Sequence, residues 1–198
     1  MAEWGSLGSG QGQFHYPHGI ALSPLGYVYV ADSLNHRIQK FTTQGEFLSE
    51  MGGFGTGPEE FNEPDGIAID ETGNLYVVDS GNHRVKKYTP DGRLYIWGEE
   101  GGGPAQFRNP SGIALDGSGN VYVTDWDNHR IKKYNTDGDL INYWGSEGSG
   151  DGQFRNPAGV TINASDGNVY VADYNNDRFQ IFIPEGLFVA KCHHLLGQ

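Results

Sequence analysis

The sequence predicts an all-β protein made of four copies of one four-stranded unit. Three observations lead to this prediction. One motif recurs four times at an even spacing, each copy contains short runs rich in β-branched and aromatic residues, and no stretch shows the periodicity of an amphipathic helix. With 198 residues, the chain is long enough for one domain with a core of useful size. We therefore expect residues 1–198 to form a single repeat domain.

The repeat is set by a Pro-x-Gly-Ile/Val motif, whose prolines stand 47, 46 and 47 residues apart along the chain. A phenylalanine precedes each proline by three residues, and an aspartate closes a Tyr-Val-x-Asp run in each copy. The landmarks are Pro17, Pro64, Pro110 and Pro157; Phe14, Phe61, Phe107 and Phe154; and Asp32, Asp79, Asp125 and Asp173. Several landmarks with one period indicate a repeat architecture.

The second copy shows the expected elements in order. It contains four runs of strand-forming residues, at 66–70, 75–79, 84–88 and 93–97. The turns between them carry Gly, Asn and Asp, which tolerate positive φ in hairpin connections. These turns are Thr72-Gly73-Asn74, Gly81-Asn82-His83 and Pro90-Asp91-Gly92.

A repeat of this length with four antiparallel strands has the size of one β-propeller blade. Apolar residues on both strand faces fit a sheet that packs between two neighbours. We expect an all-β β-propeller of four-stranded antiparallel blades, with blades at about 14–52, 61–98, 107–145 and 154–191. Residues 192–198 would form a C-terminal tail, so that Cys192, His193 and His194 are expected to lie beyond the last strand.

The motifs Gly-Gln-Phe-x-x-Pro-x-Gly-Ile-Ala and Val-Tyr-Val-Ala-Asp-x-x-Asn-His-Arg-Ile-Gln-Lys-Phe, followed by Asp-Gly and Trp-Gly, resemble the NHL repeat over nearly the whole chain. The resemblance implies a propeller that commonly has six blades. NHL propellers serve as protein-interaction modules, RNA-binding domains, extracellular sensor domains or metal-dependent amidating lyases. The four copies here are compatible with a ring of altered geometry, a part of a larger ring, or two chains that share one ring.

Charge and composition narrow the function. The 13 Lys and Arg face 25 Asp and Glu, which gives a net charge of −12, and nine of the 13 basic residues fall on the third strand of a blade. A phosphate backbone would be repelled, so nucleic acid is not the expected partner.

A single cysteine excludes an intramolecular disulfide and a cysteine zinc cluster. With no signal peptide or apolar run of membrane-spanning length, we expect a soluble chain, cytoplasmic if Met1 is the native start.

The polar residues repeated in the second turn of each blade suggest a structural role. Three equivalent histidines, His36, His83 and His129, could converge as zinc ligands, although Asp177 replaces the fourth. The simpler interpretation places Asn in the turn, with His and Arg bonded to neighbouring carbonyls or to the preceding aspartate, which itself caps the turn through an Asx-type hydrogen bond. No metal, no cofactor and no catalytic residue is expected, because no catalytic motif is present.

Positions that vary between the repeats indicate where a ligand would bind. The linker into the first strand and the turn between the second and third strands are expected on the same side of each blade. The variable residues there are His18, Asp65, Ser111 and Ala158 inside Pro-x-Gly, and Ser33, Ser80, Trp126 and Tyr174 after the aspartate. Trp126 and Tyr174 are large aromatic residues in exposed turns of adjacent blades, a composition enriched at protein interfaces. The alternative is that they only cover a blade edge.

The sequence therefore predicts a non-catalytic binding or scaffold module for a protein or peptide. The rival hypothesis is a metal-dependent propeller enzyme that uses His18, Asp65 and the repeated histidines, and RNA binding is a third. Residues 2–5 match the end of an outermost strand, yet the fourth blade already has its own at 187–191. Two segments would then compete for one edge. We expect a homo-oligomer through the terminal blades, or a fragment of a longer protein, rather than a closed monomer.

Overall fold

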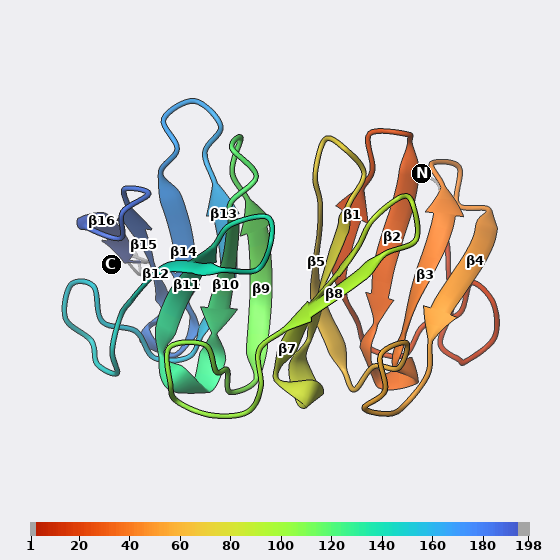
Figure 1. Cartoon of the computed structure of the whole chain (residues 1–198), viewed down its shortest axis with the longest axis horizontal. Helices are drawn as coiled ribbons and strands as arrows, with labels where there is room; N and C mark the ends of the chain where they lie inside the picture. The colour runs from red at the N-terminus through yellow and green to blue at the C-terminus, as the bar shows by residue number, and fades with distance from the viewer. Residues whose placement is uncertain (1–2, 194–198) are drawn as a thin grey trace, which may run out of the picture. The chain divides into compact units, whose positions relative to one another are not determined.

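The computed structural model describes residues 3–193 of the chain, and within them every regular element is a strand or a single 3₁₀ turn (Figure 1). The strands form four antiparallel sheets of four strands each. The all-β fold and the four-bladed organisation predicted from the sequence are thus confirmed. The chain divides after Glu99 into two compact units, each holding two blades.

The first unit contains two sheets whose strands lie in chain order. The first sheet consists of β1 (Pro17–Leu22), β2 (Tyr27–Asp32), β3 (Arg37–Thr42) and β4 (Phe47–Gly52), with the turn η1 (Ser33–Asn35) between β2 and β3. The second consists of β5 (Pro64–Ile69), β6 (Leu75–Asp79), β7 (Arg84–Tyr88) and β8 (Leu94–Trp97), with η2 (Ser80–Asn82). The strand positions predicted for this second copy agree with the structure to within two residues.

The second unit repeats this arrangement. Its first sheet consists of β9 (Pro110–Leu115), β10 (Val121–Asp125), β11 (Arg130–Tyr134) and β12 (Leu140–Trp144), with the turn η3 (Trp126–Asn128). Its second sheet consists of β13 (Pro157–Ile162), β14 (Val169–Asp173), β15 (Arg178–Phe182) and β16 (Phe188–His193), with the turn η4 (Tyr174–Asn176). The last strand is longer than expected, because Cys192 pairs with Phe179 instead of lying in a tail. His194 lies outside the described residues.

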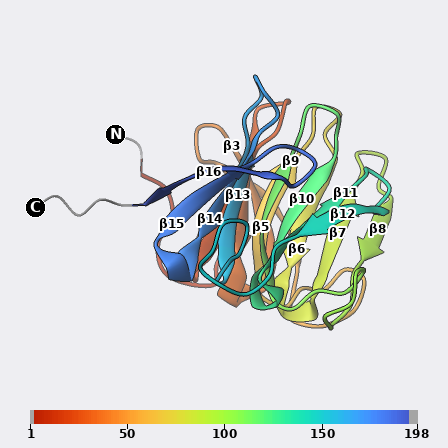
Figure 2. The ribbon, with the colours of Figure 1, turned by 90° about the vertical axis from the view of Figure 1, so that its left-hand side faces the viewer.

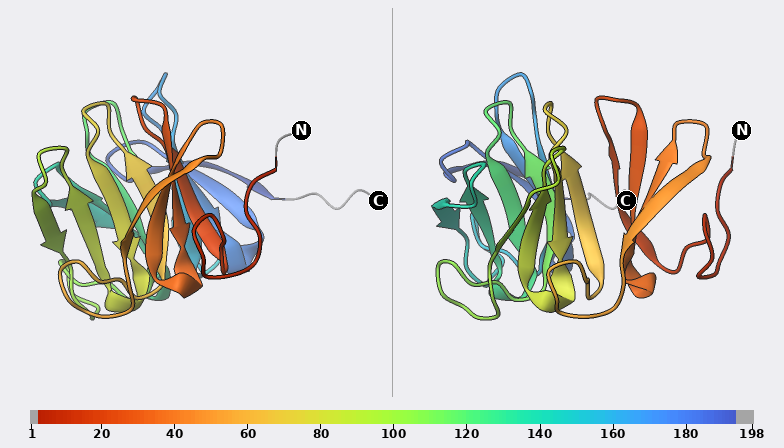
Figure 3. Two further views of the ribbon diagram at one scale, coloured as in Figure 1. Left: turned by 90° about the vertical axis from the view of Figure 1, so that its right-hand side faces the viewer. Right: turned by 45° about the vertical axis from the view of Figure 1, so that its right-hand side comes forward.

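Within each unit the two sheets lie face to face (Figures 2 and 3). They pack through apolar residues. The first unit joins Ala31 and Ile38 of the first sheet to residues of the second, namely Phe61, Ile67, Leu75 and Val77. The second unit joins Tyr122 and Ile131 to their partners Phe154, Val169, Val171 and Phe182. We call the face of a blade that packs on the next blade along the chain its forward face, and the opposite face its rear face. Burial of these faces supplies the main stabilisation of the sheets.

The position of Trp4 differs from the sequence prediction, which placed residues 2–5 at the end of an outermost strand. Its ring lies 6.1 Å from that of Phe41 on β3, just as Trp144 lies 5.9 Å from Phe182 on β15. Residues 3–5 form no strand, and β16 pairs with β15 at the edge of the fourth sheet. The expected competition of two segments for that edge is therefore not seen. Trp4 instead covers an aromatic residue of the first blade.

Each blade is held by one buried aspartate at the end of its second strand: Asp32, Asp79, Asp125 and Asp173, all with no exposed surface. In the third blade Asp125 accepts hydrogen bonds from the main-chain N–H of Arg108 at 2.8 Å and from the Asn128 amide at 2.9 Å. Arg130 donates to the same carboxylate through Nε at 2.7 Å. We call this set, repeated in every blade, the aspartate network.

The arginine of the network carries the bonds further, into the glycine-rich linker. Arg130 donates through its two Nη atoms to the carbonyls of Gly102, Gly103 and Gln106 at 2.7–3.0 Å. The predicted bonds of Arg to the aspartate and to neighbouring carbonyls are thus present, and the bond of Asn128 to the aspartate is an addition that was not predicted. The predicted Asx cap is wrong, because none of the four aspartates bonds its own turn as a cap. The carboxylates accept instead from the linker and from side chains.

The second-to-third-strand turns also differ from the expectation at the residue with positive φ. The left-handed residue that ends the turn is His36, His83, His129 or Asp177, with φ of 49–55°. Glycine and asparagine were expected there, and the other hairpins do use glycine. In the first-to-second and third-to-fourth strand turns of the second blade, Gly73 and Gly92 adopt φ of 88° and 84°. The rings of His36 and His129 each have a hydrogen-bonding partner, described below.

A second constraint is the close approach of neighbouring innermost strands at Pro-x-Gly. A Cβ atom on Gly112 would lie 2.4 Å from the carbonyl oxygen of Ala158, and one on Gly19 would lie 2.3 Å from that of Asp65. A backbone atom at that distance leaves no room for a side chain. These glycines are therefore required by packing, and neither has positive φ.

We expect Gly112→Val to cost at least about 3 kcal/mol of unfolding free energy or to prevent folding, because β13 would be forced away from β9. Urea unfolding measures this cost. The control is Gly117→Val in an open turn, where an added Cβ meets nothing within 4 Å; its effect should stay within about 0.5 kcal/mol. A Gly112→Val chain with native stability would contradict the close approach.

We also expect Asp125→Ala to lower the unfolding free energy by about 3–5 kcal/mol, since it leaves the buried Arg130 guanidinium without its carboxylate. The matched control, Asp137→Ala, removes an exposed carboxylate from the β11–β12 turn and should change stability by less than about 0.5 kcal/mol. Equal effects of the two substitutions, measured by urea unfolding, would show that the network is not a stabilising element.

The third strand places a buried polar side chain beside each network. It is Gln in the first and fourth blades and Lys in the second and third: Gln39, Lys86, Lys132 and Gln180, all with no exposed surface. Gln39 accepts from the N–H of Gly12 and donates to the Gln13 carbonyl. Lys86 donates to the carbonyls of Pro58 and Glu60 and lies over the Phe61 ring. Burial lowers the pKa of Lys86 to about 8, against the attraction of Asp79, and the pKa of Lys132 likewise to about 8.

This burial predicts a pH dependence. Above the folded-state pKa of about 8 the folded chain releases protons from Lys86 and Lys132, whereas the unfolded chain keeps them. The unfolding free energy should therefore rise from pH 8 to about 9.5. The double substitution Lys86→Gln and Lys132→Gln copies the first and fourth blades and should remove this rise while the fold is kept. Denaturant curves at a series of pH values provide the measurement, and a flat profile for the unsubstituted chain would contradict it.

Candidate functional site

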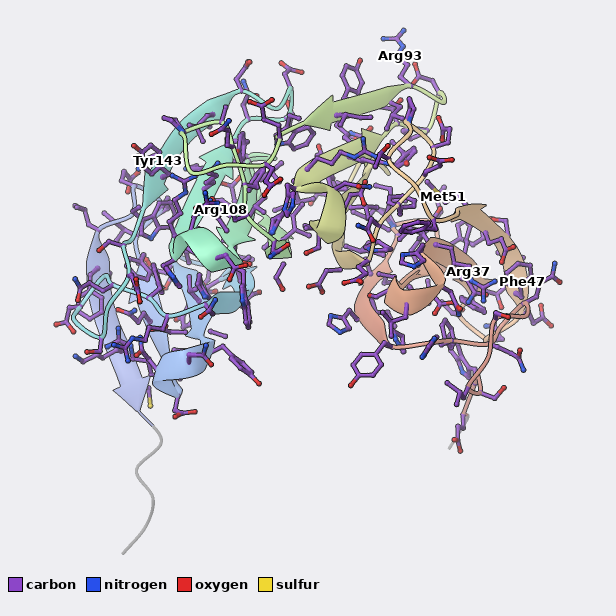
Figure 4. The ribbon with its side chains drawn as sticks, turned by 90° about the horizontal axis from the view of Figure 1, so that it is seen from below. Arg37, Phe47, Met51, Arg93, Arg108 and Tyr143 are labelled. Carbon is purple, nitrogen blue, oxygen red and sulfur yellow. The ribbon has the colours of Figure 1, made fainter. Side chains whose placement is uncertain are left out.

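In each blade the linker and the 3₁₀ turn lie together at one end of the sheet. Main-chain bonds join them directly: Ser33 N–H donates to Tyr16 O, and Asp127 N–H donates to Arg108 O. Figure 4 looks onto this end of the sheets and labels Arg37 of β3 and Arg108 of the linker before β9. The turns are thus fixed to the linkers, and the variable residues on them are held in place.

In the first unit this end forms a cavity of about 280 Å³. Its lining is Tyr16, His18, Ser33, Leu34, Glu63, Asp65 and Ser80. Four of the residues predicted as ligand-binding, from two blades, are therefore brought together here. No Lys or Arg lines the cavity, and Glu63 and Asp65 give it a negative character.

The polar centre of this cavity is a pair of side chains, His18 and Asp65. His18 Nδ1 lies 2.8 Å from Asp65 Oδ1, and the two side chains are 46% and 22% exposed. Because a carboxylate accepts, this bond places the proton on Nδ1 and leaves Nε2 of the neutral ring as an acceptor. Nε2 can therefore accept a hydrogen bond from a donor on a ligand. Ser33 is different, because its hydroxyl donates to the Pro64 carbonyl at 2.5 Å and is buried in the joint between the blades.

In the second unit the corresponding end carries an aromatic pair. The rings of Trp126 and Tyr174 lie 5.4 Å apart and are tilted by 44°. Tyr174 is 63% exposed, and Trp126 is half-buried. The two rings contact each other, and Tyr174 leaves most of its surface open to solvent. Ser111, the remaining predicted residue, is half-buried in β9.

A ladder of amide and carboxylate side chains beside the aromatic pair was missed by the sequence analysis. Asn109 and Asn156 both donate to the Asp127 carboxylate, at 2.6 and 3.1 Å. Asn175 donates to Asn156 Oδ1 at 2.9 Å. The available sequence pattern was the residue before each repeat proline, which has φ of 45° at Asn109 and 53° at Asn156. Asparagine tolerates that conformation and keeps a hydrogen-bonding side chain there.

Two of the repeated histidines act as acceptors inside the scaffold. The main-chain N–H of Glu63 donates to His36 Nδ1, and that of Asn156 donates to His129 Nδ1, both at 3.1 Å. Their bonding thus follows the structural interpretation, although the partner is an N–H group rather than a carbonyl. Within residues 3–193, no group of three or more His, Cys, Asp or Glu is placed to hold a metal ion.

Among the described residues, no helix has the length and apolar character needed to cross a membrane.

The repeated blade and its inter-blade packing define a repeat protein of the β-propeller type, and comparison with solved structures agrees. A streptogramin B lyase is 18% identical with a TM-score of 0.71, over 90% of this chain and 55% of that one. A catalytically inactive virginiamycin B lyase from Staphylococcus aureus with quinupristin is 18% identical with a TM-score of 0.70, over 91% and 56%. A protein of unknown function from Bacteroides caccae is 17% identical with a TM-score of 0.63, over 90% and 61%. Such identities establish the fold alone.

Two different family models match the two halves of the chain. The model of the SMP-30/Gluconolactonase/LRE-like region matches residues 3–96, and the NHL repeat model matches 107–134 and 154–182. B-box type zinc finger protein ncl-1 of Caenorhabditis elegans is 44% identical over 45 residues, which are 23% of this chain and 5% of that protein. The resemblance to NHL-repeat β-propellers that the motifs indicated is thus confirmed, with the NHL repeats themselves matched in the second half of the chain. It spans just over half the length of the two lyases.

Proposed function

We propose that this chain is a non-catalytic binding module that recognises a protein or peptide at the linker-and-turn end of its blades. The observation that carries the proposal is the position of the variable residues. The turns and linkers are fixed by the aspartate network, and the residues that differ between repeats form the His18–Asp65 cavity in one unit and the Trp126–Tyr174 pair in the other.

The aromatic pair suits a polypeptide ligand. Tryptophan and tyrosine combine a large apolar surface with a hydrogen-bonding group and are enriched among the residues that dominate interface energies. Tyr174 exposes most of its side chain although it is held by a rigid turn. Binding there would cost little side-chain entropy, because the two rings already contact each other.

The cavity of the first unit adds a charge preference. A volume of about 280 Å³ holds one side chain better than a drug-sized molecule. Glu63 and Asp65 favour a positively charged group, and Tyr16 and Leu34 supply apolar walls. A lysine or arginine side chain, with its apolar stem and cationic end, matches this lining.

A peptide library displayed on phage, selected against the whole chain, tests the proposal. The selected peptides should be enriched in Lys or Arg next to apolar residues. Peptides that bind the second unit should be rich in apolar residues, and for such a peptide Trp126→Ala and Tyr174→Ala should each raise Kd at least about 10-fold, which corresponds to about 1.4 kcal/mol, with little change in Tm. The control is Tyr143→Ala, an exposed tyrosine of β12 outside the turns, which should leave Kd unchanged.

Two results would contradict the proposal. One is an unchanged Kd for both aromatic variants. The other is a Tm lowered by many degrees together with unchanged binding per folded molecule, which would assign Trp126 and Tyr174 to the scaffold.

A metal-dependent propeller enzyme is the second candidate, and the observation that favours it is the His18–Asp65 pair within a cavity. A carboxylate that orients an imidazole is an arrangement used in general base catalysis, and His and Asp side chains are also common metal ligands. Elemental analysis of the purified chain separates the two candidates. Stoichiometric zinc or calcium that is lost in His18→Ala would favour the enzyme.

A further inference from the structure

The forward face of the fourth blade has the same design as the forward faces that pack inside each unit. In the first blade this face carries Ala31 and Ile38, which are 0% and 1% exposed against the second blade. The equivalent residues of the fourth blade are Ala172, which is exposed, and Phe179, which is 41% exposed. They line a largely apolar cavity of about 360 Å³ together with Gly159, Thr161 and Tyr170.

Gly159 indicates which kind of surface would pack on this face. Its counterparts Gly19 and Gly112 are required because the next blade's Pro-x-Gly carbonyl approaches to 2.3–2.4 Å of where a Cβ would lie. At Gly159 an added Cβ would meet only Ala172 Cβ, at an ordinary 3.9 Å, and φ is not positive. Nothing within the described chain demands a glycine here. The backbone of a further blade, placed as in the two internal joints, would demand one.

The chain itself carries the matching surface. The rear face of the second blade uses Ile67 of β5, which is 7% exposed, to pack on the first blade. The equivalent Ile20 of β1, on the first blade, is 66% exposed, and Leu22 beside it on the same face is 64% exposed. Within its own unit, the fourth blade leaves its forward face uncovered, and the first blade leaves its rear face uncovered.

A polar contact would complete the joint in the same way. In each unit a histidine at the end of the 3₁₀ turn accepts from the N–H of the residue before the next blade's proline: His36 from Glu63, and His129 from Asn156. The fourth blade has Asp177 at this position, in the same left-handed conformation. The first blade has Tyr16 before its proline, with φ of 57° close to the 49° of Glu63. A carboxylate accepts from an N–H as an imidazole nitrogen does.

We propose that the forward face of the fourth blade docks on the rear face of the first blade of a second copy of this chain. The joint continues the blade-to-blade interface found inside each unit. Gly159 lies against the Pro-x-Gly backbone around His18 of the second copy, Phe179 packs against Ile20, and Asp177 accepts from the Tyr16 N–H. Such a contact joins different surfaces of the two copies and is heterologous, so that the assembly closes or extends through repeated copies of it. This inference is independent of the proposed function.

Sedimentation velocity and light scattering of the whole chain over a range of concentrations test the proposal. The unsubstituted chain should form species of two or more copies. Gly159→Ala should raise the dissociation constant at least 100-fold, because its Cβ meets the docked carbonyl, and should leave the Tm of the single-copy species unchanged, because the chain alone has room for it. The matched control, Gly117→Ala, places a Cβ in open space in the same unit and should associate normally.

A second variant tests the other half of the joint. Ile20→Lys places a charge on the rear face of the first blade and should also give single copies. A mixture of Gly159→Ala and Ile20→Lys chains retains one intact joint and should recover a two-copy species. An unsubstituted chain that stays at single-copy mass up to about 0.1 mM would overturn the proposal. Association that survives Ile20→Lys would overturn it too, since two fourth blades would then be meeting each other.

Discussion

The structure depends on one interaction, the buried aspartate at the end of each second strand. Its carboxylate bonds an irregular linker, a tight turn and the first residue of the third strand at once, as Asp173 does with Arg155, Asn176 and Arg178 at 2.7–3.0 Å. Burial of a charged group is costly unless it is fully paired. Here the arginine neutralises the charge and its remaining donors satisfy linker carbonyls that no strand could pair. The glycine-rich segments are thereby anchored to the strands by buried hydrogen bonds.

Linkers and turns anchored in this way suit the recognition role that we propose for this end of the blades. A loop that must be ordered on binding loses affinity to entropy, whereas a loop already fixed does not. The network leaves the residue after each aspartate and the residue inside each Pro-x-Gly free to vary, because neither takes part in it. In the first unit those positions supply His18 and Asp65, and in the second they supply Trp126 and Tyr174. The same scaffold therefore presents different chemistry from blade to blade.

Much of the fold was predictable because each element occurs in four copies of the repeat, so that a pattern found in one copy can be checked in the other three. Strand positions followed from the alternation of aromatic and β-branched residues between turn residues, and the pairing of variable positions at one end followed from strand order. The role of Asp32 was not predictable. From the sequence alone, an aspartate before a turn is equally suited to cap that turn and to bond a distant linker. Its actual partner is the main-chain N–H of His15, which is 17 residues away. The contact of Trp4 with Phe41 was missed for the same reason, and so was the amide ladder around Asp127.

The claim that buried aspartates order the linkers is tested most directly by hydrogen exchange of four main-chain amides, those of His15, Asn62, Arg108 and Arg155. None of them belongs to a strand, yet each donates to a network aspartate at 2.6–2.8 Å. If the account is right, these amides exchange as slowly as those of the central strands β2, β6, β10 and β14, because both open only when the blade unfolds. Exchange at the rate of an unstructured peptide would contradict it.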